Sequence, residues 1–278
     1  MITALLLATH LVLAQEVRTF EIINPEVHPG DTVVVRMEPQ WRVPLSCIAA
    51  FGKRHSPNEF GYVFIGINLS TKLGKEEIFR VDCGLGFRLD SYSAEVTVTA
   101  KEFPKTRNIR RGQPSEPCGG SRLKQVRETY NALAIYLPDL TSAQTYRDPM
   151  DIARDISHYY GFIYASNPSF PHCGVDLRMK SGTRVRAINR GIVALTGRFR
   201  TEGNIIIVNH GLGIFSVYMH LSRINVKVGQ IIENGQVIGF SGRTGAGVTE
   251  DHLHLNIWIH DGYVDPLLFV DTVNQHLK

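Results

Sequence analysis

The stretch of residues 251–259, DHLHLNIWI, constrains this chain more than any other. Its β-branched and aromatic residues are typical of a strand, and alternate side chains of a strand share one face of the sheet. We therefore expect His252 and His254 to lie on one face, while Leu253 and Leu255 point into an apolar core. Two imidazoles backed by such a core suit a metal ion or acid–base chemistry, although a His-x-His strand more often carries two ordinary, partly exposed histidines.

Other residues upstream supply the remaining parts of a metal site. His172 and Asp176 are four residues apart, and His220 ends a strand-like run. A catalytic zinc site uses three nitrogen or oxygen ligands and leaves one position open for water. We expect His172, Asp176 and His254 to be the ligands, which leaves His220 and His252 for proton transfer. The alternative is that His172 and His220 are separate loop histidines.

The composition describes a soluble globular protein of two domains. The chain has 278 residues, of which 43% are hydrophobic and 20% are charged, and this length allows two separate cores. The net charge of +4 is compatible with an anionic polymer as a partner, but no basic-aromatic motif indicates a nucleic acid. No segment after residue 14 has the length and apolarity of a membrane span. We assume a monomer.

Short strand-like runs separated by turn signals fill the first domain, which we place at residues 16–103. This spacing is typical of an all-β sandwich, and the length fits an immunoglobulin-like domain. No group of titratable residues there forms a chemical site, so we expect a structural or binding module. The expected strands are Val17–Ile23, Thr32–Met37, Tyr62–Leu69, Glu77–Asp82 and Ala94–Ala100.

Residues 104–160 are expected to form a basic linker and a helical connector. Proline, glycine and an excess of lysine and arginine mark the first part of this segment as an exposed linker. Apolar residues at helical spacing then predict a helix over Ser121–Leu137, with Ser121 as its cap. A second short helix is expected within Asp148–Tyr160.

The last domain, at residues 161–275, returns to strands and is expected to be an antiparallel β-sheet with long loops and no helical periodicity. Asp261-Gly262 predicts a tight hairpin turn. The expected strands are Val185–Ile188, Gly191–Leu195, Asn204–Asn209, Ile214–Leu221, Gln236–Phe240 and His254–His260.

The first 14 residues form an apolar run that is too short to cross a bilayer. The run is similar to a secretory signal peptide, with Val12 and Ala14 as small residues before a cut at Gln15. No lysine or arginine precedes it, so a buried first strand or helix is the alternative. We expect residues 1–14 to be a signal peptide and the protein to be exported, either to a periplasm or out of the cell.

The four cysteines, an even number, fit an exported chain. Cys47 and Cys83 both lie in strand-like runs of the first domain, which is compatible with a bridge between them. Together with Cys118 and Cys173 they allow three pairings, and the sequence leaves all three open. None has the Cys-x-x-Cys spacing of a thiolate zinc site.

Several motifs in the last third of the chain occur in a recognisable order. They are His172-x-x-x-Asp176, Gly182-Thr183-x-Val185-x-Ala187, Gly203-Asn204, Tyr218-Met219-His220-Leu221-Ser222, Val228-Gly229-Gln230, Asn234-Gly235-Gln236-x-Ile238-Gly239, Ser241-Gly242-x-Thr244-Gly245 and His252-Leu253-His254. In this order they resemble the lysostaphin/LytM-type zinc endopeptidases of peptidoglycan. Phe64-Ile65-Gly66-Ile67-Asn68-Leu69 and Lys101-Glu102-Phe103-Pro104 also resemble the immunoglobulin-like domain that precedes this peptidase domain in some exported members.

The resemblance implies a role for each candidate residue. His172, Asp176 and His254 match the zinc ligands, and His220 and His252 match the two catalytic histidines. It implies an exported zinc endopeptidase that hydrolyses peptide cross-links or stem peptides of peptidoglycan. The alternative is a catalytically silent LytM-like domain that binds cell wall or regulates another wall hydrolase. A purely structural zinc is disfavoured, because such sites usually fill all four positions with protein ligands.

Overall fold

The computed structural model describes residues 19–38, 46–58, 60–106, 146–147, 149, 155–164, 171–260 and 262–276. Almost all regular structure in these ranges is β-strand, and α2 (Pro266–His276) is their one helix, which confirms the mainly-β prediction. Within the same ranges no helix is long and apolar enough to cross a membrane. The expected signal peptide at residues 1–14 and the expected helix over Ser121–Leu137 lie outside the described residues.

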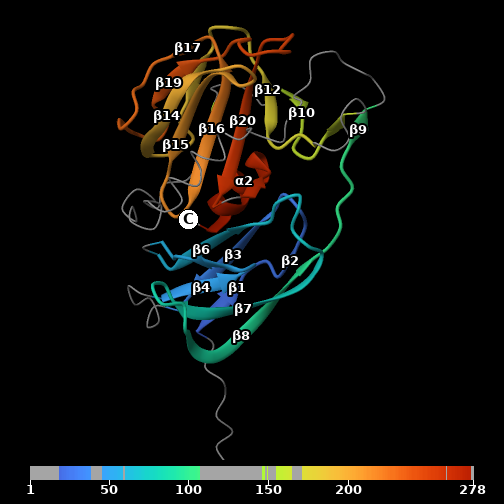
Figure 1. Cartoon of the computed structure of the whole chain (residues 1–278), viewed down its shortest axis with the longest axis vertical. Helices are drawn as coiled ribbons and strands as arrows, with labels where there is room; N and C mark the ends of the chain where they lie inside the picture. The colour runs from blue at the N-terminus through green and yellow to red at the C-terminus, as the bar shows by residue number, and fades with distance from the viewer. Residues whose placement is uncertain are drawn as a thin grey trace, which may run out of the picture.

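Two β-sheets form the first part of the molecule, drawn in blue to green in Figure 1. The smaller sheet has the order β1 (Phe20–Ile22), β3 (Thr32–Met37), β6 (Tyr62–Gly66). The larger sheet has the order β2 (Glu26–Val27), β8 (Arg88–Val98), β7 (Gly74–Asp82), β4 (Ser46–Ala50), β5 (Lys53–His55). Val33 and Ile65 of the smaller sheet share one buried core with Ile48, Ile78 and Val96 of the larger sheet. This is the two-sheet packing of a β-sandwich.

A disulfide joins Cys47 in β4 to Cys83, the residue that follows β7. The structure thus selects one of the pairings that the sequence left open. Cys173 in the last domain is disulfide-bonded as well. Bonds of this kind persist in oxidising compartments.

An eight-stranded sheet, largely antiparallel, dominates the last part of the molecule (Figure 1). Its order is β10 (Ile156–His158), β12 (Val175–Arg178), β20 (His252–Ile259), β16 (Ile214–Leu221), β15 (Gly203–Asn209), β14 (Gly191–Phe199), β18 (Ile231–Ile232), and β21 (Gly262–Val264) pairs with β20. A smaller sheet has the order β13 (Arg184–Arg186), β19 (Val237–Phe240), β17 (Arg223–Ile224). A separate two-stranded sheet is formed by the parallel pair β9 (Lys105–Thr106) and β11 (Ile163–Tyr164).

The two parts share apolar contacts at one end of β20. Val34 and Phe64 of the first part belong to the same buried cluster as the main core of the last part. The chain at Gly66 approaches Ile259 so closely that a Cβ added there would lie 3.0 Å from the Cβ of Ile259. Ile259 ends β20 and His252 begins it, so these positions are about 23 Å apart along the strand. This contact with β20 therefore lies far from His252. Gly30 and Phe103 of the first part also contact Tyr160 and Gly161 of the last part.

Some predicted elements are wrong. The helix expected within Asp148–Tyr160 is contradicted by its described part, which forms strand β10 beside β12. The last domain also ends in a helix, α2, whose buried Phe269, Val270 and Val273 pack into the main core. The apolar residues of this 11-residue segment give only a weak helical periodicity in the sequence. A helix of this length is stabilised mainly by its packing against the rest of the domain. Gly262 pairs with Ile259 inside the hairpin instead of forming its turn.

Candidate metal centre

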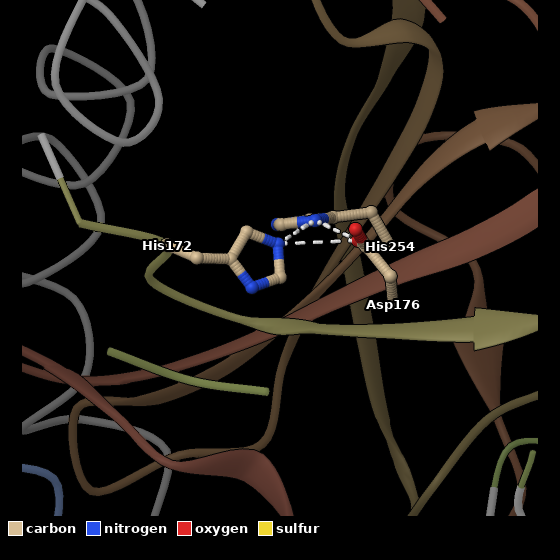
Figure 2. A group of neighbouring side chains, drawn as sticks. All are labelled: His172, Asp176 and His254. Carbon is tan, nitrogen blue, oxygen red and sulfur yellow. Dashed lines mark hydrogen bonds and ion pairs between the residues drawn. The ribbon is translucent and has the colours of Figure 1, made fainter. Parts of the chain in front are cut away.

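Three predicted ligands converge on one point in the last domain. Nε2 of His172 lies 3.0 Å from Nδ1 of His254 and 3.2 Å from Oδ1 of Asp176. Nδ1 of His254 lies 2.7 Å from the same Oδ1. Figure 2 shows the two rings and the carboxylate directed at one another. Among the described residues, this is the one group of histidine, cysteine and acidic side chains placed to hold a metal ion.

Strand register places two of these ligands side by side. Asp176 on β12 is paired directly with His254 on β20, and directly opposed residues of antiparallel strands project to the same face. His172 precedes β12 and turns its ring back toward them. Leu253 and Leu255 of β20 are almost fully buried on the opposite face. The alternation expected from the sequence is therefore confirmed for this strand.

Backbone carbonyl groups fix the orientation of three histidine rings. In each of these rings Nδ1 lies 2.9 Å from a backbone carbonyl oxygen. The partner of His172 is Tyr159, that of His220 is Thr244, and that of His252 is Glu250. A carbonyl oxygen only accepts hydrogen bonds, so Nδ1 carries the proton in each ring. In the neutral ring Nε2 then carries a lone pair, available to a metal or to a proton.

Gly174 gives His254 the space that it needs. A Cβ added at Gly174 would collide most closely with the backbone carbonyl oxygen of Leu255, and it would lie 2.6 Å from Oδ1 of Asn256 and 2.8 Å from Nε2 of His254. All three distances are shorter than atoms in contact tolerate, so any other residue here would displace β20 or the His254 ring that it carries. The loop between His172 and Asp176 is therefore shaped around His254.

The charges within the cluster follow from burial and from close contacts. Burial opposes ionisation of Asp176, but the charge of His172 and the hydrogen bonds from His158, His172 and His254 hold the pKa of that carboxyl well below its usual range. Burial by itself would lower the pKa of His172, and the neighbouring Asp176 carboxylate outweighs it and raises that pKa. Burial lowers the pKa of His254. Asp176 is therefore an ionised, preorganised anionic ligand.

A β-bulge directs His220 toward this cluster. The β15–β16 pairing runs from Asn204 opposite Leu221 to Ile206 opposite Tyr218, so that two residues of β16 oppose one of β15. His220 is the second of the two, and its φ is +62°, a left-handed conformation that is uncommon for residues other than glycine. Without the bulge, strict alternation would place His220 on the face opposite His254.

The two predicted catalytic histidines lie together beside the ligands. The ring centroids of His220 and His252 are 4.8 Å apart, and the His220 centroid lies 5.9 Å from that of His254. Nε2 of His252 is 3.7 Å from Oδ1 of Asp176. Burial, helped by the charges of His254 and His252, lowers the pKa of His220 to about 3, so this ring is neutral at physiological pH. All five predicted site residues are thus brought into one cluster.

Two further histidines differ in how they relate to the cluster. His210 follows β15 at the hairpin end of β15 and β16, and its ring nitrogens lie 2.7 Å from the carbonyl oxygen of Arg190 and 2.8 Å from Oγ of Ser216. It is a core histidine away from the metal ligands. His158, by contrast, lies 3.1 Å from Oδ2 of Asp176. Sequence reasoning missed this contact because it placed His158 in a helix.

The residues present fit a zinc ion. Two imidazole nitrogens and one carboxylate oxygen are ligands that zinc prefers, and three protein ligands leave one position for water or substrate. Nε2 of His172 is already turned into the cluster by the Tyr159 carbonyl contact. This His-Asp-His arrangement is the zinc site that the sequence motifs predicted.

Comparison with known proteins agrees with this geometry. Residues 170–266 match the model of peptidase family M23. A crystal structure from Pseudomonas aeruginosa described as an M23 peptidase is 27% identical and has a TM-score of 0.63, with 90% of this chain and 96% of that chain covered. Its fold therefore extends over both parts of the molecule.

Two curated relatives match shorter stretches of this chain. Peptidoglycan DD-endopeptidase ShyA of Vibrio cholerae is 42% identical over 87 residues, which are 31% of this chain and 20% of that protein. Lysostaphin of Staphylococcus staphylolyticus is 40% identical over 108 residues, 36% of this chain and 22% of that protein. The chain thus covers only about a fifth of either relative. The domain at residues 170–266, which carries the His-Asp-His site, is therefore an M23 peptidase domain of the lysostaphin/LytM type.

Proposed function

We propose that this protein is a zinc endopeptidase that hydrolyses peptide cross-links or stem peptides of bacterial peptidoglycan. The observation that carries the proposal is the combination of three converging ligands with two further histidines beside them. A purely structural zinc site usually fills all four positions with protein ligands, so it would not leave two unligated histidines beside three ligands.

The residues of the cluster divide the chemistry between them. When bound, zinc polarises a scissile carbonyl and lowers the pKa of water to near 7. His252 presents Nε2 to the site, since its Nδ1 is held by the Glu250 carbonyl, and we assign to it the removal of a proton from the attacking water. His220 presents Nε2 in the same way and shares this proton transfer. The histidine that has gained the proton then returns it to the leaving amide nitrogen.

The substrate is proposed from the relatives and from the place in which the protein acts. ShyA is a peptidoglycan DD-endopeptidase by name, and it is 42% identical to this chain over 87 residues. The Cys47–Cys83 bond and the bonded Cys173 support an exported protein, periplasmic or secreted, which would meet peptidoglycan there. We assign to the first domain the role of a binding module, since its contacts with β20 lie at the end of that strand away from His252.

Digestion of purified sacculi tests the proposal. We expect the protein to release soluble muropeptides, a chelator to stop the release, and added zinc to restore it. Mass spectrometry of the products identifies the bond that is cut. Asp176→Asn removes the anionic ligand and keeps its shape, so it should bind less zinc and release no muropeptides.

The alternative, a silent domain that binds cell wall or regulates another hydrolase, predicts a different outcome. Such a protein would bind sacculi and zinc, yet release no muropeptides at any zinc concentration. That result would refute the enzymatic proposal while leaving the metal site intact.

A further inference from the structure

His158 makes a contact with the anionic ligand that the zinc site by itself does not require. Its Nδ1 lies 3.1 Å from Oδ2 of Asp176. The other carboxylate oxygen, Oδ1, is the one that lies 2.7 Å from His254 and 3.2 Å from His172. The two oxygens of Asp176 are thus divided: one faces the ligand cluster and the other faces His158.

The local backbone is built to bring His158 to this place. On β10, Ile156 is opposite Leu177 and His158 is opposite Asp176, so Ser157 is an extra residue that forms a bulge. In a regular pairing Ser157 would face Asp176. Because directly opposed residues project to the same face, the bulge places the ring of His158 beside the carboxylate.

The ring of His158 is also held from its other side. It packs edge-on against Phe162 at 5.2 Å and lies 6.1 Å from the ring of His172, and only 20% of its side chain is exposed. The next residue, Tyr159, supplies the carbonyl that binds Nδ1 of His172. Two adjacent residues therefore orient two of the three metal ligands.

We propose that His158 is a positioning residue for the metal site. A carboxylate accepts hydrogen bonds and never donates them, so His158 donates its Nδ1–H to Oδ2. This bond restrains rotation of the carboxylate and presents Oδ1 alone to the metal. Such partners of metal ligands set ligand orientation and contribute strongly to metal affinity. The inference rests on the zinc site of the proposed function and adds to it the residue that orients Asp176.

Two substitutions separate the hydrogen bond from the packing of the ring. His158→Phe keeps an aromatic ring against Phe162 and removes the donor. His158→Asn loses the ring, but its amide nitrogen is the same number of bonds from Cβ as Nδ1, so it can donate to Oδ2. A purely structural role predicts that Phe is the better replacement, and the positioning role predicts that Asn is.

His28 provides a matched control. Its Nδ1 lies 3.2 Å from Oδ2 of Asp31 in the first domain, so the same kind of histidine–aspartate pair occurs away from the metal centre. His28→Phe removes a donor of the same kind with no metal ligand beside it. We expect its zinc affinity to equal that of the unmodified protein.

The experiment measures the zinc dissociation constant of the full chain by competition with a chromophoric chelator, and the absorption spectrum of the cobalt-substituted protein. We expect His158→Phe to weaken zinc binding roughly 10–100-fold and to alter the cobalt spectrum, and His158→Asn to recover most of the affinity. If circular dichroism shows that the Phe variant is unfolded, His158→Ala and His158→Asn give the same comparison.

Unchanged affinity and spectrum in His158→Phe would overturn the inference, and so would equal losses in the Phe and Asn variants. Failure of the unmodified protein to bind zinc would instead refute the metal site of the proposed function. The two failures are therefore distinguishable.

Discussion

Removal of either histidine to which we assign proton transfer, His220 or His252, should separate zinc binding from hydrolysis. His220 and His252 lie 4.8 Å apart between ring centroids and beside the ligands, but neither belongs to the group of converging ligand atoms. We therefore expect His220→Ala and His252→Ala to retain zinc. General acid–base help is worth about 10²–10⁴-fold in rate, which corresponds to about 3–5 kcal/mol of transition-state stabilisation. A loss of that size is expected for each variant.

The loss should fall on kcat more than on KM, because proton transfer affects charge that develops only in the transition state. His220→Gln and His252→Gln refine the test, since glutamine reaches about as far as Nε2 but takes up no proton. These variants should be as inactive as the alanine variants if proton transfer is the role, and partly active if only a hydrogen bond is needed.

The assay compares zinc content with initial rates of muropeptide release, and His28→Ala serves as a control outside the site. Loss of zinc from His252→Ala would make this residue a ligand and refute the assignment. Near-full activity in either alanine variant would show that the residue in question is not catalytic. Equal activity of the glutamine variant and the unmodified protein would refute proton transfer by that residue.

Three further predictions concern the frame around the site. Gly174→Ala should weaken zinc binding, because the added methyl group would press on the backbone carbonyl of Leu255 and lie 2.8 Å from Nε2 of His254, and so displace β20 or the ligand that it carries; unchanged zinc affinity would contradict this. Replacement of Cys47 and Cys83 by serine removes a bond between residues 36 positions apart and should lower the free energy of unfolding by about 4 kcal/mol, measured by urea denaturation. Burial lowers the pKa of His210 to about 4, whereas the value in the unfolded chain is about 6.5. As the pH falls below about 6.5 the unfolded state therefore takes up a proton that the folded state does not. The free energy of unfolding, fully retained above about pH 6.5, should drop by about 3 kcal/mol as the pH falls toward 4. Urea denaturation of the zinc-free protein at both pH values, with His210→Gln as comparison, should show a smaller loss in the variant.

Much of the metal centre could be predicted from sequence because its geometry is local. The two-residue period of a strand places His252 and His254 on one face whatever the rest of the chain does, and the buried Leu253 between them confirms this. The close spacing of His172 and Asp176 likewise keeps them within reach of one another. The mainly-β class followed in the same way from short runs of β-branched residues between turn signals.

Other features depended on contacts that no local pattern records. The helix α2 is held by packing of Phe269 and Val273 into the main core, and strand β10 forms because it pairs with β12. The pairing of Cys47 with Cys83 was one of three possibilities until β4 and β7 were placed side by side. Each of these outcomes is decided by partners that are distant in sequence.

The clearest case is the pair of bulges that complete the site. Strict alternation would turn His220 away from His254 and would set Ser157, not His158, beside Asp176. One extra residue in β16 and one in β10 reverse both expectations. A bulge is a mismatch between two paired strands, so it exists only once both strands and their hydrogen bonds are in place. The sequence determined which residues the metal centre uses, and tertiary pairing decided how His220 and His158 reach it.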